Sequence, residues 1–169
     1  SANMFLPFFL TIVNTLPLAS FTGLASSYCI NNLPATLYPT TAGGTFTGTA
    51  VIGNTFDPSI YTFNGGPLYY ISKVKYQITD ANGCSNSDSV NTNVYNVPAV
   101  TISGLATAYC ANANNDTMVV SPIGGTITAG IGLSGNIFSP SLANLGNNPI
   151  YYSYTSSNNC TNIDTLEIT

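Results

Sequence analysis

The residues of this chain that could do chemistry are few, and four cysteines come first among them. Cys29 and Cys84 lie in the first half, and Cys110 and Cys160 lie at matching places in the second. Because the chain has neither a C-x-x-C pair nor a histidine, a zinc site is not indicated. Two pairs at matching positions predict one disulfide in each half, Cys29–Cys84 and Cys110–Cys160, in an oxidising compartment. Each disulfide would close a loop of about 50 residues and contribute about 4 kcal/mol.

The other ionisable side chains form no catalytic pattern. Catalysis needs a group that exchanges protons near neutral pH, or an activated nucleophile. Here histidine is absent, the cysteines are expected to be paired, and the six acidic residues are scattered. We therefore expect no enzyme, no cofactor and no metal.

Three smaller groups of residues have both a functional and a structural interpretation. Asp80 and Asn82 could contact calcium, but that cation takes about six to eight oxygens, so we favour a hairpin turn. Lys73 and Lys75 could form Lys–Asn isopeptide bonds, but the second half has no lysine, so we favour charges that guard an exposed strand. Six tyrosines could stack on sugars, but alternation in strands favours packing. They are Tyr69, Tyr70, Tyr76, Tyr151, Tyr152 and Tyr154.

The composition is polar but nearly uncharged. Charged residues make up 5% of the chain, against about 25% in ordinary soluble domains. With two lysines, no arginine and a net charge of -4, nucleic-acid binding is close to excluded. Asn, Ser and Thr supply 60 of the 169 residues. Such a surface repels its neighbours weakly and suits a secreted protein that packs against copies of itself or a matrix. A merely neutral exported domain is the alternative.

The chain contains one sequence unit twice. Ser20–Cys29 returns as Thr101–Cys110, 81 residues later. A Gly-Gly-Thr, an Asn-x-Phe-x-Pro-Ser and a Tyr-Tyr pair occur after it in both copies, and the offset then falls to 76. Because such repetition sets the architecture, we predict a first domain at 16–97 and a second at 98–169, preceded by a segment at 1–15.

Short apolar segments separated by Gly, Pro and Asn indicate β-strands, and no segment has a helical period. The pattern predicts an all-β chain of two tandem antiparallel β-sandwich domains. The second copy lacks six residues around 71–77, and we expect its final strand to be truncated or nearly so. In the first copy the expected strands are Leu16–Phe21, Ala35–Tyr38, Thr45–Thr47, Asn54–Phe56, Leu68–Ile78 and Ser87–Tyr95.

The amino-terminal segment is apolar on both faces of an extended chain. At the offset of 81, Thr11–Pro17 lies over Thr92–Pro98, so residues 1–14 stand where an upstream repeat would have its last strand. The run is about half the 20 or so residues that span a bilayer, and no positive residue precedes it, so we assign it to the mature chain. Pro7 favours an edge position or a kink over a central position. The expected interface residues are Met4, Phe5, Leu6, Phe8, Phe9, Leu10, Ile12 and Val13.

Both copies share motifs with a known repeat. The first copy has Gly23-Leu24, Tyr28-Cys29, Gly43–Phe46, Gly53–Pro58 and Tyr76–Cys84. Over residues 16–169 this order resembles an Ig-like repeat of secreted surface proteins of Bacteroidota. The resemblance implies export and an Ig-like sandwich, in proteins that act as adhesins, stalks and surface arrays, and it names no ligand. The second copy departs from it at 156–159, where the Asp and Gly are missing, so we expect a different turn there.

The resemblance also gives weight to Asp-Ser/Thr followed by an aliphatic residue, which is similar to the O-glycan acceptor of that group. Chance matches in a chain rich in Ser and Thr are the alternative, and the sequon at 115–117 is a weaker indication of modification. The candidate acceptors are Ser89, Thr117 and Thr165.

These observations together predict a structural subunit of an extracellular filament. Residues 1–14 would insert beside the final strands of the second domain of a neighbouring copy, in a head-to-tail homopolymer. The alternative is a fragment of a large cell-surface adhesin whose repeats act as stalk or glycan-binding modules. We expect a location outside the cell or at its surface, no nucleic-acid partner and no membrane span, with other surface proteins or glycans as further partners.

Overall fold

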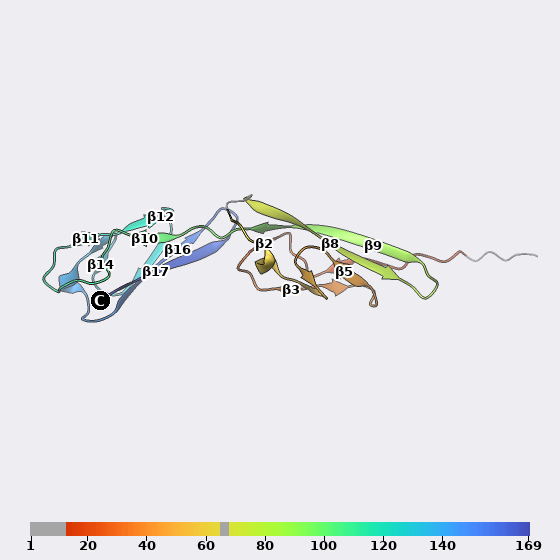
Figure 1. Ribbon diagram of the computed structural model, residues 1–169, viewed down its shortest axis with the longest axis horizontal. Coiled ribbons are helices and arrows are strands. Elements are labelled where there is room, and N and C mark those ends of the chain that lie inside the picture. Colours follow the sequence, from red (N-terminus) through yellow and green to blue (C-terminus); the bar gives the residue numbers. More distant parts are fainter. Residues whose placement is uncertain (1–12, 65–67) are drawn as a thin grey trace, which may run out of the picture. The chain divides into compact units, whose positions relative to one another are not determined.

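The computed structural model describes residues 13–64 and 68–169 (Figure 1). Within these ranges the regular elements are antiparallel β-strands and two short 3-10 turns, with no α-helix. The predicted all-β class is therefore confirmed, and the several antiparallel sheets are consistent with a β-sandwich.

The chain forms two compact units that do not match the sequence repeats throughout. The first unit holds the described residues up to Tyr28, then Leu33–Tyr61 and Ile71–Asn93. The second holds Cys29–Asn32, the described part of Thr62–Tyr70, and Val94–Thr169. The domain boundaries at 16–97 and 98–169 describe the repeats and stay a prediction.

The first sequence copy forms three sheets. The largest has the strand order β2-β9-β8-β5. The other two have the strand orders β1-β4 and β3-β7-β6. The short turn η1 (Pro58–Ile60) comes after β7. The strands are β1 (Phe21–Thr22), β2 (Ser27–Cys29), β3 (Ala35–Thr36), β4 (Tyr38–Pro39), β5 (Thr45–Thr47), β6 (Val51–Ile52), β7 (Thr55–Phe56), β8 (Tyr69–Thr79) and β9 (Ser85–Tyr95).

The second copy repeats this plan. Its sheets are β13-β16-β17, β10-β12 and β11-β15-β14, which correspond to β5-β8-β9, β1-β4 and β3-β7-β6 of the first copy. The turn η2 (Pro140–Leu142) corresponds to η1. The strands are β10 (Thr101–Ser103), β11 (Asp116–Thr117), β12 (Val119–Ser121), β13 (Thr126–Ala129), β14 (Leu133–Ser134), β15 (Ile137–Phe138), β16 (Asn148–Thr155) and β17 (Thr161–Ile168).

Two predicted strands differ from the structure. The expected strand Ala35–Tyr38 is split, because the chain leaves one sheet after β3 and enters another at β4. The residue between them, Leu37, is buried, and its N–H donates to the Asn54 carbonyl at 2.7 Å. The expected strand Leu16–Phe21 is absent from described residues 16–20, and strand structure begins only at Phe21.

The core of the first copy is built around aromatic side chains. The Phe46 ring lies between Phe21, at 5.2 Å in an edge-to-face contact, and Tyr76, at 4.6 Å. Along β8 the side chains alternate, so Tyr76 is buried while Lys73 on the other face is exposed. Such pairs add about 0.5–1.5 kcal/mol each beyond the apolar area that they bury.

The tyrosine of this alternation has a counterpart in the second copy. Tyr152 is as buried as Tyr76, which confirms packing for these two of the six candidate tyrosines. The second core gathers four buried side chains with Tyr109 and other half-buried residues packed against them. The four are Met118, Phe138, Ile150 and Ile168.

The Gly-Gly pair of each copy is explained by this buried tyrosine. In the second copy Gly124 has a φ of 95°, a left-handed conformation that favours glycine. The N–H of Gly125 donates to the Tyr152 hydroxyl at 2.8 Å, and this hydroxyl donates to the Pro122 carbonyl. A Cβ at position 125 would lie 2.3 Å from the Ser153 carbonyl oxygen and 2.6 Å from the Tyr152 ring. The first copy has the same arrangement, built from Thr41, Gly43, Gly44 and Tyr76.

We expect Gly125→Ala to lower the free energy of unfolding by about 2 kcal/mol, because the added methyl overpacks against backbone and a buried ring. Gly130→Ala is the matched control, since a Cβ there would meet nothing within 4 Å. Urea unfolding of both variants measures the difference. Equal stability of the two would contradict the packing explanation.

Candidate functional site

The hairpins that carry Cys84 and Cys160 have the same turn. We call residues 79–85 the first cysteine hairpin and residues 155–161 the second. In the first hairpin the Gly83 N–H donates to the Asp80 carbonyl, and the Asp80 N–H donates to the Cys84 carbonyl. In the second, Asn159 and Ser156 make the same two bonds with Ser156 and Cys160, and all four distances are 2.9–3.0 Å. The left-handed residue is Gly83 in one and Asn159, with φ of 61°, in the other.

The different turn expected at 156–159 is therefore not found, because asparagine tolerates the left-handed region better than most residues. In the first hairpin Asp80 is used by the turn. Its Oδ1 accepts from the N–H groups of Asn82, at 2.9 Å, and Cys84, at 2.8 Å. This agrees with the turn interpretation of Asp80. In the described part of the chain no group of three or more His, Cys, Asp or Glu could hold a metal.

The disulfide prediction is wrong in its pairing. The structure joins Cys29 to Cys160, with Cα atoms 5.6 Å apart, and neither Cys29–Cys84 nor Cys110–Cys160 forms. Among the described residues Cys84, which is half-buried, and Cys110, which is exposed, carry free thiols.

Strand length explains why a copy does not close its own disulfide. Cys84 immediately precedes β9, whereas Cys29 lies at the other end of that strand, where the Ile30 N–H donates to the Tyr95 carbonyl at 3.0 Å. β9 has 11 residues, which span about 35 Å. A disulfide needs Cα atoms within about 7 Å.

The same separation holds in the second copy. Cys160 precedes β17, and Tyr109, next to Cys110, donates its N–H to the Thr169 carbonyl beyond the far end of that strand. The eight residues of β17 span about 26 Å. Sequence reasoning matched the cysteines by repeat and did not see that each strand would hold them apart.

The disulfide belongs to the second unit, which uses a loop of the first sequence copy. We call Cys29–Asn32 the first cysteine loop. Its turn is closed by the Asn32 N–H on the Cys29 carbonyl at 3.0 Å, and Asn32 Oδ1 accepts from the Cys29 N–H at 2.8 Å. Asn31 Nδ2 donates to the Thr161 carbonyl at 3.1 Å, one residue beyond the bonded Cys160.

The segments that enter the two units are held in the same way. Asn86 Nδ2 donates to the Pro17 carbonyl, and Asn162 Nδ2 donates to the Pro98 carbonyl, both at 2.9 Å. Each asparagine lies two residues after a hairpin cysteine. Pro17 therefore takes in the first unit the place that Pro98 takes in the second, which supports the alignment of these segments by the repeat.

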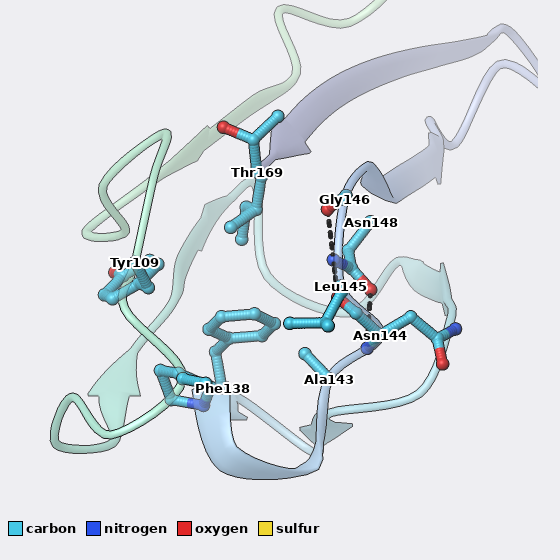
Figure 2. A pocket seen from close by; sticks show the side chains of 11 residues that line it. Tyr109, Phe138, Ala143, Asn144, Leu145, Gly146, Asn148 and Thr169 are labelled. Atoms are coloured by element: carbon cyan, nitrogen blue, oxygen red, sulfur yellow. Dashed lines mark hydrogen bonds between the residues drawn. The ribbon is translucent and has the colours of Figure 1, made fainter.

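A pocket of about 50 Å³ lies in the second unit, where β17 ends. Figure 2 shows the Phe138 ring and the Leu145 side chain pointing toward each other, with Tyr109 and Thr169 around them. Leu145 is 93% exposed. We call this the Tyr109 pocket. Its lining also includes Ala111, Pro140, Ala143, Asn144, Gly146, Asn148 and Ile168.

One polar side chain of the lining, that of Asn148, is bonded to the protein itself. The buried Asn148 side chain donates to the carbonyls of Asn144 and Gly146, at 2.9 and 2.8 Å, and accepts from the Asn144 N–H at 3.2 Å. The exposed wall of the pocket is mixed, with polar and apolar groups in similar amounts. Its apolar part, which includes Phe138, Leu145 and Ile168, could receive an apolar side chain.

Tyr109 is held against this pocket by a carboxylate. Its hydroxyl donates to Asp116 Oδ2 at 2.7 Å and accepts from the Ala106 N–H at 2.8 Å. Burial, and then the bond to Asp116, raise the pKa of Tyr109. The same hydrogen bond, and after it that from the Thr117 N–H, lowers the pKa of Asp116.

At the place that corresponds to the pocket, the first copy has a buried valine. Ile168 and Thr169 correspond to Thr92 and Asn93 at the offset of 76, and β9 continues from these to Val94, which is 0% exposed. In the first copy the next position on that face of the strand is thus filled by valine. At the offset of 81, the counterpart of Val94 is Val13, whose exposure is 89%.

The other predicted interface residues, from Met4 to Ile12, lie outside the described residues. The candidate acceptors Ser89, Thr117 and Thr165 are exposed. In all three, the N–H of the Ser or Thr donates a hydrogen bond to the carboxylate of the preceding aspartate, at 2.7–2.9 Å. Their accessibility permits modification, and glycosylation stays a prediction.

No protein-family model matches the chain, and no curated protein matches it. Among the helices of the described residues, none is long and apolar enough to cross a membrane. Four features of the chain occupy repeat-related positions: the Tyr109 pocket and the Cys110 thiol in the second unit, and the exposed Val13 and the Cys84 thiol in the first.

We expect the Tyr109–Asp116 bond to make stability depend on pH at both extremes. A lowered Asp116 pKa adds stability that is present above the ordinary value of 3.8 and lost as pH falls through the folded value. A raised Tyr109 pKa adds stability that is present below 10.0 and lost as pH rises through the folded value. Tyr109→Phe should flatten both limbs of a plot of the unfolding midpoint against pH.

Tyr28→Phe is the control, because the Tyr28 hydroxyl meets the backbone of Ala25 and Gly23 and no carboxylate. Thermal unfolding from about pH 2.5 to about pH 11 separates the two variants. Identical limbs in Tyr109→Phe and the unsubstituted protein would show that this pair does not contribute to the pH dependence.

Proposed function

We propose that this protein is a structural subunit of an extracellular filament that grows head to tail. Each subunit would consist of two tandem Ig-like sandwiches and a donor strand formed by residues 1–14. In this proposal the protein is not an enzyme, needs no cofactor, and has copies of itself as its main partner. The disulfide supports a location outside the cytoplasm, since such bonds persist in oxidising compartments.

The observation that carries the proposal is the equivalence of the two entry segments. Asn86 holds Pro17 as Asn162 holds Pro98, so the residues before Pro17 correspond to those before Pro98. At the offset of 81, positions 4–14 correspond to Ser85–Tyr95, the whole of β9. The amino-terminal segment thus has the repeat position of a strand that belongs to the preceding sandwich.

The acceptor in a neighbouring copy would be the Tyr109 pocket. Val13 would fill it beside Ile168, as Val94 fills the next place after Thr92 on β9. The backbone has a matching partner, because the Ile30 N–H donates to Tyr95, and the corresponding pair is the Ala111 N–H with Asn14. Strand addition of this kind combines main-chain hydrogen bonds with side chains that enter pockets.

The energetics require more than one side chain. Burying a valine contributes about 1.5–3 kcal/mol, whereas association costs about 4–15 kcal/mol in lost freedom of motion. Val13 alone cannot hold two copies together. Residues 4–12 correspond to the same repeat positions as Thr161–Thr169, which β17 already occupies, so they would lie beside β17 at the edge of the β13-β16-β17 sheet. Four apolar side chains buried there would contribute about 6–12 kcal/mol.

The surface charge does little to oppose such assembly. With 5% charged residues and a net charge of -4 on 169 residues, copies repel one another weakly. The contact joins two different surfaces, so it propagates without limit unless the rotation between copies closes a ring. A single type of contact is therefore sufficient to build a filament.

The second candidate function is that of a stalk or glycan-binding module in a cell-surface adhesin. It is favoured by Tyr69 and Tyr151, which are exposed, in contrast to Tyr76 and Tyr152. Exposed tyrosine rings are suitable for stacking on sugars. In that case the isolated protein would be monomeric and would bind a glycan, which a glycan array combined with sizing chromatography would reveal.

We expect Val13→Asp to weaken self-association by about 100-fold or more, because a charge would have to be buried against Phe138 and Ile168 without a partner. The exposed position of Val13 means that the fold itself should keep its unfolding midpoint. Light scattering and negative-stain electron microscopy of the full chain measure polymer mass and length.

Leu33→Asp is the matched control, since Leu33 is a comparably exposed apolar residue of the first copy. Deleting residues 1–14 should abolish polymers entirely. Polymers of unchanged length in both Val13→Asp and the deletion would refute the donor-strand contact. An unsubstituted chain that stays monomeric at high concentration would favour the adhesin candidate.

A further inference from the structure

The disulfide of the second unit joins two parts that each occur twice in the chain. One part is the first cysteine loop, Cys29–Asn32, and the other is the second cysteine hairpin, residues 155–161. Besides the sulfur bond, Asn31 Nδ2 donates to the Thr161 carbonyl. The loop comes from one sequence copy and the hairpin from the next.

The repeat counterpart of the loop is closed by the same backbone hydrogen bond. Residues 110–113, the second cysteine loop, are closed by the Ala113 N–H on the Cys110 carbonyl at 2.9 Å, as Asn32 closes on Cys29 at 3.0 Å. Asn112 stands where the first loop has Asn31. Cys110 at its start is exposed and carries a free thiol.

The repeat counterpart of the hairpin keeps its shape. The first cysteine hairpin has the same pair of turn hydrogen bonds as the second. Hydroxyls also meet across the base of each hairpin, Thr79 with Ser85 at 2.7 Å and Thr155 with Thr161 at 2.8 Å. Cys84 in this hairpin carries the other free thiol.

We propose that Cys110 of one protein molecule forms a disulfide with Cys84 of the next molecule in the filament, so that neighbouring subunits are covalently joined. The inference rests on the proposed head-to-tail function and identifies the bond that would lock it. It would repeat, between two protein molecules, the contact that Cys29 and Cys160 make within one molecule. Asn112 Nδ2 would then donate to the Ser85 carbonyl, as Asn31 donates to Thr161.

A second molecule of this protein is the partner that fits, because both free thiols lie beside the surfaces of the proposed contact. Cys110 stands between Tyr109 and Ala111, two residues of the Tyr109 pocket. Cys84 lies two residues before Asn86, which holds the entry segment at Pro17. The thiols thus belong to the acceptor and donor sides, and to different compact units of one chain.

The bond requires an oxidant, for which a low-molecular-weight disulfide suffices. The Cys110 thiolate attacks that disulfide, forming a mixed disulfide and releasing one small thiol. The Cys84 thiolate of the neighbouring copy then attacks the Cys110 sulfur and releases the second small thiol. The two protein thiols lose two protons and two electrons, and the small disulfide is reduced to two thiols.

The test uses the full chain, Cys84→Ser and Cys110→Ser, each incubated with oxidised glutathione as the probe. In non-reducing denaturing electrophoresis the unsubstituted protein should give a ladder of covalent oligomers that collapses on reduction. Each variant alone should stay a single-chain band. An equimolar mixture of the two variants should give a covalent dimer and nothing larger, because each supplies only one of the two thiols.

Four results would overturn the inference. A dimer from Cys110→Ser alone would indicate Cys84–Cys84 pairing, and one from Cys84→Ser alone would indicate Cys110–Cys110 pairing. A monomer whose thiols are oxidised would indicate a bond within one chain. The fourth is the absence of any ladder from particles that light scattering shows to be polymeric. That result leaves the filament in place and removes only its crosslink, whereas a chain that is monomeric by light scattering removes the filament itself.

Discussion

The architecture depends on the distance between the two cysteines of each sequence copy. In the first copy they stand at opposite ends of β9, 11 residues long, so backbone hydrogen bonds of the sheet hold them about 35 Å apart. The two cysteines of one sequence copy therefore cannot form a disulfide with each other. The structure meets this constraint once, by placing the loop that begins at the end of β2 on the hairpin of the next copy and joining Cys29 to Cys160. The remaining cysteines are Cys84, in the first cysteine hairpin, and Cys110, in the second cysteine loop, and neither forms a disulfide within the chain.

Polar interactions in this protein are made by hydroxyls and amides in place of charges. A tyrosine hydroxyl closes the Gly-Gly turn in both copies. Asn86 and Asn162 hold the entry segments, and Asn148 organises the loop over Phe138. Neutral groups of this kind are specific in geometry but generate almost no long-range field, so they position the chain without opposing contact between copies. A carboxylate is used at Tyr109, where it fixes one wall of the pocket.

Much of the local structure could be predicted, because it depends on neighbouring residues. The expected strand Leu68–Ile78 forms β8, and the hairpin turn expected at Asp80 and Asn82 is present. Errors arose where tertiary contacts decide. Ala35–Tyr38 reads as one strand, yet the buried Leu37 marks a change of sheet. Residues 156–159 lack glycine, yet Asn159 adopts the left-handed conformation because the pairing of β16 with β17 demands it.

The sequence by itself determined that the chain is all-β, that it repeats one unit, and that residues near Pro17 correspond to those near Pro98. These conclusions come from alternation, turn residues and self-similarity, which are local or one-dimensional properties. Only the tertiary structure decided which cysteines pair, where the Tyr109 pocket opens, and which valine stays exposed. Those depend on the register and length of paired strands, since hydrogen bonds between distant segments set which side chains can meet in space.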